Sequence, residues 1–477
     1  MSTHYERLSA QDSSFLVFES PNTHMHVAGV AILEAGPLAT PDGGIDMRRL
    51  REYINSRLPW LPRYRQRVAY TPIEGEAIWV DDDHFNLGYH VRHTSLPRPG
   101  DERQLKRLCA RILSQQLDRG KPLWELWIVE GLADGRFAFV SKAHHCMVDG
   151  IAGVDLVSVL LSPTPEQTFP QAARWKPRPA PDQIDLLRDA LLRRAQTPLT
   201  LARALRRALQ EPNQTLTELQ ARVNAAWQLV GAGLRRPANT PLNQPIGPHR
   251  RLDWLTLDLR AVKDVKNRLG GTVNDVVLAT VAGAVGRFLR ARGVRLGGLD
   301  YRTVIPVSVR AAEEYGTMGN RVSAWITSLP IQQRDPRKRF TTVRETTTSL
   351  KDSKQALGVE VLTQVGAWAG TGLLTLGVRL ASRLHPYNLV VTNVPGPQDP
   401  LYLLGARMLF GYPQVPLFEN QGLGVALFSY CGQLCWGLNA ERDLVPDLHD
   451  FASAIVDSFR ELHEAATGSA ATAHRRA

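Results

Sequence analysis

A segment that is unsuited to form a compact core interrupts this chain near its middle. The segment from Ser162 to Pro181 is rich in proline and polar residues. The segment from Asp182 to Arg236 has helical patterns and many arginines. Because a single hydrophobic core stops growing at roughly 250–300 residues, a chain of 477 residues is expected to divide at such a segment. We predict a first domain over 1–165, a linker over 166–245 and a second domain over 246–477, with a disordered tail from about 467.

Both flanking regions alternate strand-like and helix-like patterns, which is typical of α/β domains. In the first region we expect strands at 26–33 and 135–145 and helices at 105–117 and 150–161. In the second we expect strands at 253–258, 303–309, 322–329, 389–393 and 424–430, and helices at 273–292, 336–350 and 446–464.

The charge balance favours an anionic partner. The formal net charge is +11, which suits nucleic acid, anionic lipid or a phosphorylated ligand. The sequence has no paired zinc-ligand spacing, no aromatic RNA-binding strand and no basic region that runs into heptads, so nucleic-acid binding is not expected. The arginine-rich stretch over 182–236 has two interpretations, a solvated helical face or a surface that rests on anionic lipid.

Cysteine usage and hydropathy suggest a location. The four cysteines show no pairing typical of a metal or redox site, which fits a reducing cytoplasm. The N-terminus lacks the apolar core of a secretion signal. The longest nearly uncharged stretch, Val361 to Val378, falls short of the roughly 20 apolar residues that a spanning helix needs. Any membrane contact is therefore expected to be peripheral.

Two adjacent histidines end the predicted strand at 135–145. Side chains of a strand alternate between its faces, so His144 and His145 must point in opposite directions. His145 shares its face with Phe137, Phe139, Ser141 and Ala143. The two rings therefore cannot have the same function, because only one of them can face a given cavity.

Asp149 and Gly150 follow where the next helix is expected to begin. An aspartate there accepts hydrogen bonds from free backbone amides, and a glycine lets the chain turn tightly. A neutral imidazole on a rigid strand end is suited to remove a hydroxyl proton near pH 7. One alternative is a metal site, since two histidines and an aspartate are possible ligands, although rings on opposite faces argue against it. Another pairs His144 with Asp149 and makes His144 the base.

The run HHCMVDG, from His144 to Gly150, resembles the HHxxxDG motif of chloramphenicol acetyltransferase, carnitine acyltransferases and peptide-synthetase condensation domains. Further blocks resemble the bacterial wax ester synthase/diacylglycerol acyltransferases in particular. They are collinear from Leu8 to about Glu464 and comprise LSAQDSSFLVFESPNTHMHV (8–27), LDRGKPLWELWIVEGL (117–132), LNQPIGPHRR (242–251), NDVVLA (274–279), VIPVSVR (304–310) and TNVPGP (392–397).

The resemblance implies an α/β fold of two chloramphenicol-acetyltransferase-like domains with mixed sheets, joined by a helical linker and meeting at a central channel that holds the motif. It implies transfer of an acyl group from acyl-CoA to a fatty alcohol or to diacylglycerol. His145 is then the base that takes the hydroxyl proton. Neither a covalent acyl-enzyme nor a metal is implied, since a thioester is already activated.

Several other residues have a structural and a functional interpretation. Thr272 and Asp275 fit a helix capping box, which gives Asp275 a structural role. Asn274, one residue earlier, is a candidate for orienting the acceptor or the oxyanion. Arg310 ends an apolar strand, and in the wider superfamily the motif aspartate pairs with an arginine, so an Asp149–Arg310 bridge is expected. Pro122-Leu123-Trp124 is expected to pack, and Cys146 to fill volume.

Two other classes of function share these features. An acyltransferase of this type can take its acyl group from a carrier-protein thioester, and turnover of free acyl-CoA distinguishes the two. A catalytically inactive protein that binds lipid droplets is the non-enzymatic alternative. For the leading hypothesis we expect a cytoplasmic protein in peripheral contact with the inner membrane or with lipid inclusions.

Overall fold

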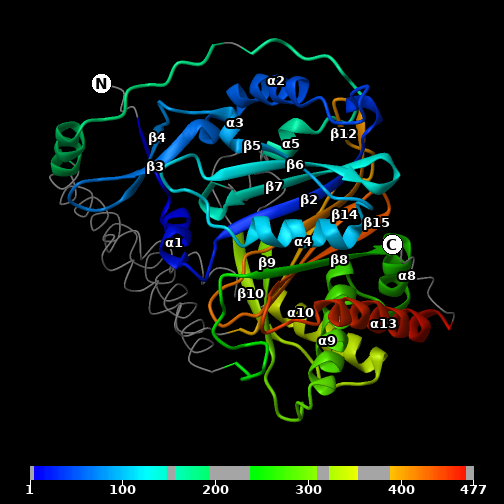
Figure 1. Ribbon diagram of the computed structural model, residues 1–477. Helices are drawn as coiled ribbons and strands as arrows, with labels where there is room; N and C mark the ends of the chain where they lie inside the picture. The colour runs from blue at the N-terminus through cyan, green and yellow to red at the C-terminus, as the bar shows by residue number, and fades with distance from the viewer. Residues whose placement is uncertain are drawn as a thin grey trace.

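Two six-stranded sheets, each covered by helices, form the body of the protein (Figure 1). The computed structural model describes residues 5–147, 156–172, 174–192, 237–308, 322–352 and 387–468. We call the part built on the sheet that contains His144 the N-lobe, and the part built on the other sheet the C-lobe. Both sheets mix parallel and antiparallel pairs, as expected for the predicted α/β class.

The N-lobe sheet has the strand order β12-β13-β2-β7-β6-β5. A small sheet, β1-β4-β3, lies beside it. The strands are β1 (Glu6–Arg7), β2 (His26–Glu34), β3 (Gln66–Tyr70), β4 (Ala77–Asp81), β5 (Val91–Ser95), β6 (Trp124–Leu132), β7 (Arg136–His144), β12 (Tyr402–Leu403) and β13 (Ala406–Gln414). The N-lobe helices are α1 (Ala10–Phe18), α2 (Met47–Arg57), α3 (Leu87–His90), α4 (Glu102–Leu113) and α5 (Leu156–Leu160).

Strand β13 crosses from the C-terminal part of the sequence into the N-lobe. It pairs antiparallel with β2, from Met408 opposite Leu33 to Gln414 opposite Ala28. Residues 402–414 therefore belong to the N-lobe sheet in space, although they lie within the segment that the sequence analysis gives to the second domain.

The C-lobe sheet has the order β10-β9-β11-β14-β15-β8, with helices packed on one face. Its strands are β8 (Arg250–Asp258), β9 (Arg302–Ser308), β10 (Val322–Ser328), β11 (Leu389–Pro395), β14 (Leu423–Tyr430) and β15 (Gln433–Glu441). Its helices are α8 (Leu259–Leu269), α9 (Val273–Ala291), α10 (Pro336–Asp352) and α13 (Leu448–Thr467).

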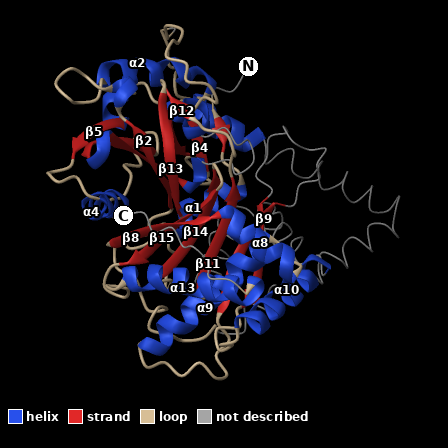
Figure 2. Ribbon diagram, turned by 90° about the vertical axis from the view of Figure 1, so that its right-hand side faces the viewer, coloured by secondary structure: helices blue, strands red, loops and turns tan. Residues whose placement is uncertain are grey.

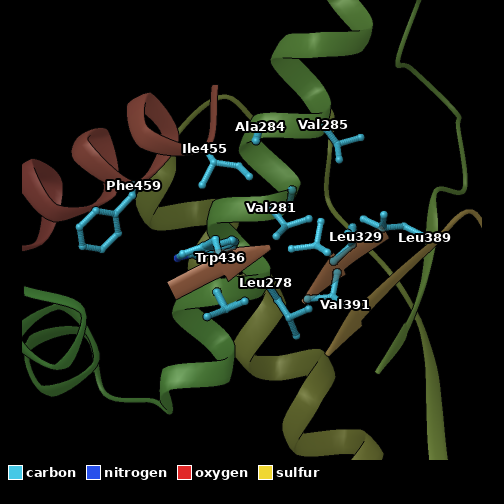
Figure 3. Packing of buried hydrophobic residues seen from close by; sticks show 14 of the residues in the cluster. Leu278, Val281, Ala284, Val285, Leu329, Leu389, Val391, Trp436, Ile455 and Phe459 are labelled. Atoms are coloured by element: carbon cyan, nitrogen blue, oxygen red, sulfur yellow. The ribbon is translucent and has the colours of Figure 1, made fainter. Parts of the chain in front are cut away.

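Helix α9 is the centre of the C-lobe core. Leu278 and Val281 contribute to the same cluster as Trp436 of β15 and Ile455 of α13 (Figure 3). A helix that is apolar on all sides must be buried on all sides, and the chain from residue 275 to 286 is buried without interruption. Gly286 permits this packing, because a Cβ there would lie 2.2 Å from the carbonyl oxygen of Ile331.

The two lobes meet where their sheets approach each other (Figure 2). Tyr412 of β13 stacks on Trp254 of β8 with ring centroids 5.2 Å apart. Lys106 of α4 lies over the Trp254 ring and forms an ion pair of 2.6 Å with Asp253. A Cβ at Gly437 of β15 would lie 1.7 Å from the carbonyl oxygen of Pro413. The contact is thus too close for any other residue at 437 without a shift of backbone.

Most of the predicted elements are present. The expected strands at 26–33, 253–258 and 424–430 correspond to β2, β8 and β14, and the helices at 105–117, 273–292, 336–350 and 446–464 to α4, α9, α10 and α13. The tail beyond 468 and most of the arginine-rich stretch lie outside the described residues. Among the described helices no single one is long and apolar enough to cross a membrane, and the pair α8 and α9 passes that test only together, with a bend of 99°.

Candidate active site

The two histidines lie where β7 ends and the chain turns. Strand β7 stops at His144, and His145 begins a 3₁₀ turn, η5 (His145–Met147). As predicted, the residues that alternate along β7 pack on opposite faces: Phe137 and Phe139 join one hydrophobic cluster, and Ala138 and Val140 join another. The rings of His144 and His145 consequently have different surroundings.

His145 is held by the N-terminal segment. Its backbone N–H donates to the carbonyl oxygen of Met25 at 2.8 Å, and its ring stacks on Phe15 of α1 with centroids 3.9 Å apart and planes 18° from parallel. Burial lowers the pKa of His145 to about 4, with a smaller opposing contribution from its own backbone. At pH 7 its imidazole is therefore neutral and able to accept a proton.

His144 is buried at the last position of β7. The N–H of Cys146 donates to His144 Nδ1 at 3.2 Å, so Nδ1 is an acceptor and the ring proton sits on Nε2. Nε2 lies 3.6 Å from Glu19 Oε1, longer than a hydrogen bond. Burial lowers the pKa of His144 to about 3, and the positive charge of Arg119 contributes to this shift. The ring is therefore neutral at pH 7 and forms no ion pair with the Glu19 carboxylate.

Three side chains behind His144 were missed by the sequence analysis. Glu19, the residue that caps the C-terminus of α1, accepts from Arg119 Nε at 3.0 Å and from its Nη2 at 2.7 Å. His26 Nε2 lies 3.6 Å from the other oxygen of the same carboxylate. His26 is also the strand partner of His144 across β2 and β7. This buried polar group connects α1 to the end of β7.

The missed residues carry a signal in the sequence. Glu19 and His26 both belong to the block at 8–27 that resembles the acyltransferase family. A glutamate at the end of an apolar helix and a histidine at the start of an apolar strand are both unusual enough to mark a buried polar contact. Only the fold shows that both face His144.

The expected packing role of Pro122-Leu123-Trp124 is present. Leu123 and Trp124 are buried, and the carbonyl oxygen of Leu123 accepts from the His144 N–H at 2.9 Å. The Trp124 indole N–H donates to the carbonyl oxygen of Tyr64 at 2.8 Å. This segment thus fixes the backbone of the first histidine.

Asn274 and Asp275 lie in the first turn of α9. Thr272 and Asp275 form the predicted capping box, and Asp275 Oδ1 also accepts from Thr347 of α10 at 2.6 Å. The Asn274 Oδ1 atom accepts from Asn393 Nδ2 at 3.2 Å, which joins the NDVVLA and TNVPGP segments. With its oxygen used in this way, the Asn274 amide is oriented to donate through its own N–H groups.

Cys146 is buried, and its Sγ lies 3.0 Å from His144 Nδ1. Burial, with nearby Asp12 and Glu19, raises the pKa of this thiol well above its usual range. The thiol therefore stays protonated at neutral pH and is a poor nucleophile.

Three residues of the predicted site, Asp149, Gly150 and Arg310, lie outside the described residues. Among the described residues there is no group of three or more histidine, cysteine, aspartate or glutamate side chains arranged to hold a metal ion.

The two-lobed arrangement, with a neutral histidine at the end of a central strand, defines the protein as one with the fold of condensation domains. The first condensation domain of the CDA synthetase is 18% identical, with a TM-score of 0.57 over 100% of this chain and 99% of that domain, and shows the fold alone. The wax ester synthase/diacylglycerol acyltransferase from Marinobacter aquaeolei VT8 is 26% identical, with a TM-score of 0.66 over 97% of this chain and 100% of that one.

Sequence comparison gives the family. Residues 8–277 match the wax ester synthase/diacylglycerol acyltransferase catalytic domain, and residues 318–463 match the C-terminal domain of the same family. A putative diacylglycerol O-acyltransferase of Mycobacterium tuberculosis is 34% identical over 96% of this chain and 90% of its own length. The probable diacylglycerol O-acyltransferase tgs1 of the same organism is 32% identical over 95% of both. The chain belongs to the wax ester synthase/diacylglycerol acyltransferase family.

Proposed function

We propose that this protein is an acyl-CoA-dependent O-acyltransferase that forms triacylglycerol from diacylglycerol, a wax ester from a long-chain alcohol, or both. Its family, and the names of its relatives in Mycobacterium tuberculosis, support this class of reaction. The observation that carries the proposal for this chain is the buried imidazole of His145, which is neutral at pH 7 and held between Met25 and Phe15.

In the proposed reaction His145 removes the proton from the acceptor hydroxyl. The oxygen attacks the thioester carbonyl, a C–O bond forms, and the tetrahedral oxyanion collapses as the C–S bond breaks. The proton on His145 then passes to the departing CoA thiolate, so the base is regenerated. The apolar surroundings that lower the pKa of His145 also exclude water, which would otherwise hydrolyse the thioester.

Asn274 is proposed to orient the acceptor or to stabilise the oxyanion through its side-chain N–H groups. The contact with Asn393 supports this role, because it uses the amide oxygen and leaves the donors available. Asp149, Gly150 and Arg310 complete the proposed site. There Gly150 turns the chain, and an Asp149–Arg310 bridge holds the loop after His145.

Direct transfer is favoured over a covalent intermediate on Cys146. A thiol whose pKa is raised by burial, and whose sulfur contacts His144, is not activated for attack. We also propose peripheral contact with the inner membrane or with lipid inclusions, because both acceptors are poorly soluble in water.

The test is release of thiol from palmitoyl-CoA, with hexadecanol and diacylglycerol as competing acceptors. His145→Ala is expected to lower acceptor-dependent release by roughly 10²–10⁴-fold, the usual contribution of a general base. His144→Ala should leave a reduced but measurable rate, since that ring supports structure. His84→Ala, at a side chain that is 85% exposed, is the matched control.

Each outcome has a consequence. Full activity of His145→Ala would refute the base assignment and direct attention to His144 paired with Asp149. No release by the wild type with either acceptor would favour a carrier-protein thioester as donor. Binding of triacylglycerol without turnover of either kind of donor would indicate the non-enzymatic alternative.

A further inference from the structure

A long cleft runs between the lobes beside α4. It has a volume of about 2220 Å³, and its walls are α4 and residues 134–136 of the N-lobe and β8 and α13 of the C-lobe. Figure 1 shows α4 lying along β8 at the front of the molecule. Neither His145 nor Asn274 lines this cleft, so it is distinct from the site described above.

The cleft has an excess of positive charge. Ten lysines and arginines line it, against six aspartates and glutamates. Five of the six acidic groups already have basic partners. Lys106 pairs with both Glu102 and Asp253 at 2.6 Å, and Asp134, Asp258 and Asp457 pair with Arg136, Arg260 and Arg460.

Three of the arginines form a row on α4. Arg103, Arg107 and Arg111 are spaced four residues apart, which places them on one face of the helix over roughly 12 Å. All three are exposed, and Arg251 of β8 is exposed on the opposite wall. Within the described part of the chain none of these four arginines has an acidic partner within ion-pair distance. An extended row of unpaired guanidinium groups suits a ligand with several anionic groups rather than a single carboxylate.

One end of the cleft lies close to the catalytic histidine. Arg250, which lines the cleft, donates to the carbonyl oxygen of Asn22 at 2.5 Å. Asn22 is three residues from Met25, whose carbonyl oxygen accepts the His145 N–H. Three residues span at most about 11 Å, so the Arg250 end of the cleft lies within the length of a flexible arm from His145.

We propose that this cleft binds the phosphate-bearing nucleotide end of the acyl-CoA donor, with the α4 arginines as its main contacts. The inference rests on the proposed function, which supplies the donor. The nucleotide carries a pyrophosphate and a ribose phosphate, which together match an extended row of cations. The pantetheine arm then leads past Arg250 toward His145, while the acceptor approaches His145 by another route.

Shape argues for a free ligand over a membrane surface. The arginines line a concave space between two walls, and a planar bilayer cannot enter it. An anionic headgroup and a nucleotide phosphate offer the same chemistry to an arginine, so the experiment must separate them.

The test compares two donors with three proteins. The proteins are the wild type, the Arg103→Gln/Arg107→Gln/Arg111→Gln variant, and an Arg48→Gln/Arg295→Gln control at exposed arginines outside the cleft. The α4 variant should raise the KM for palmitoyl-CoA by roughly tenfold or more and leave kcat unchanged. With palmitoyl-pantetheine, which has no nucleotide, its KM should equal that of the wild type. The control should match the wild type with both donors.

Three results would overturn the proposal: an unchanged KM for palmitoyl-CoA, an equal rise for both donors, or a loss confined to binding of phosphatidylglycerol vesicles. Calorimetric titration with adenosine 3′,5′-bisphosphate tests the cleft without any turnover. Wild-type binding that the α4 variant loses would support the cleft even if the enzyme proved inactive toward acyl-CoA. Turnover of palmitoyl-CoA that the α4 variant leaves unaltered would reject the cleft and keep the proposed function.

Discussion

The surroundings of His144 and His145 differ because adjacent residues at the end of a strand face opposite ways. That difference follows from the sequence alone, since a strand of period two cannot point both rings into one space. The stacking of Phe15 on His145 and the contact of Glu19 with His144 could not be predicted, because they join residues more than a hundred positions apart. The order of residues around a strand end does not indicate which helix packs against it.

The pH dependence should reveal the burial of His145. Its pKa of about 4 lies below the ordinary 6.5 because burial disfavours the charged form. The proposed base is therefore neutral above about pH 5, and we expect activity to be lost only as pH falls through the lower value. We expect kcat/KM for the wild type to stay level from pH 8 to about pH 5.5 and to fall below that.

The measurement is kcat/KM against pH at constant ionic strength, with thermal unfolding followed at each pH to exclude loss of fold. His84→Ala should give the same profile as the wild type. An acid limb centred near 6.5 would mean that the ring is solvated in the working enzyme.

At the scale of elements, strands β13 and β15 have no counterpart among the predicted strands, for two different physical reasons. Strand β15 was missed, although a two-residue turn joins it to β14 through Cys431 and Gly432, both with positive φ. Such turns are recognised in a sequence by pairs such as Asn-Gly or Asp-Gly, and Cys-Gly is not one of these pairs. Strand β13 was missed because its pairing with β2 joins residues that are far apart in the chain.

Helix α9 provides a test of close packing. A glycine inside a helix normally costs about 0.5–1 kcal/mol relative to alanine, so replacement by alanine usually stabilises. At Gly286 the added methyl would meet the Ile331 carbonyl oxygen at 2.2 Å. We therefore expect Gly286→Ala to reduce the free energy of unfolding by about 1–3 kcal/mol.

Chemical denaturation of Gly286→Ala beside Gly36→Ala measures this. A Cβ added at Gly36 would have no atom within 4 Å, so its substitution should change the free energy of unfolding little. Stabilisation by Gly286→Ala would show that α9 can move away from residue 331 without cost.

At the scale of the molecule, the interface between the lobes includes a close approach of two backbones, that of β15 in the C-lobe and that of β13 in the N-lobe. The Cβ of an alanine at 437 would lie 1.7 Å from the Pro413 carbonyl oxygen, so β15 and β13 must separate to admit it. We expect Gly437→Ala to lower the unfolding temperature and to reduce kcat as well, because the lobes that hold His145 and Asn274 shift relative to each other.

Gly297→Ala, where the added carbon meets nothing within 4 Å, is the control and should retain both properties. Unchanged kcat in Gly437→Ala would indicate that the relative position of the lobes has no bearing on the chemistry.

The crossing of β13 also sets an order of events during synthesis. The exposed edge of β2 is made early, and its partner leaves the ribosome only after most of the chain. At roughly 5–20 residues per second the edge stays open for on the order of tens of seconds. During that time it offers unpaired backbone groups to any other nascent strand. The N-lobe sheet is therefore completed only when β13 has been made. A gene that separated the two halves of the chain would leave the N-lobe without this strand.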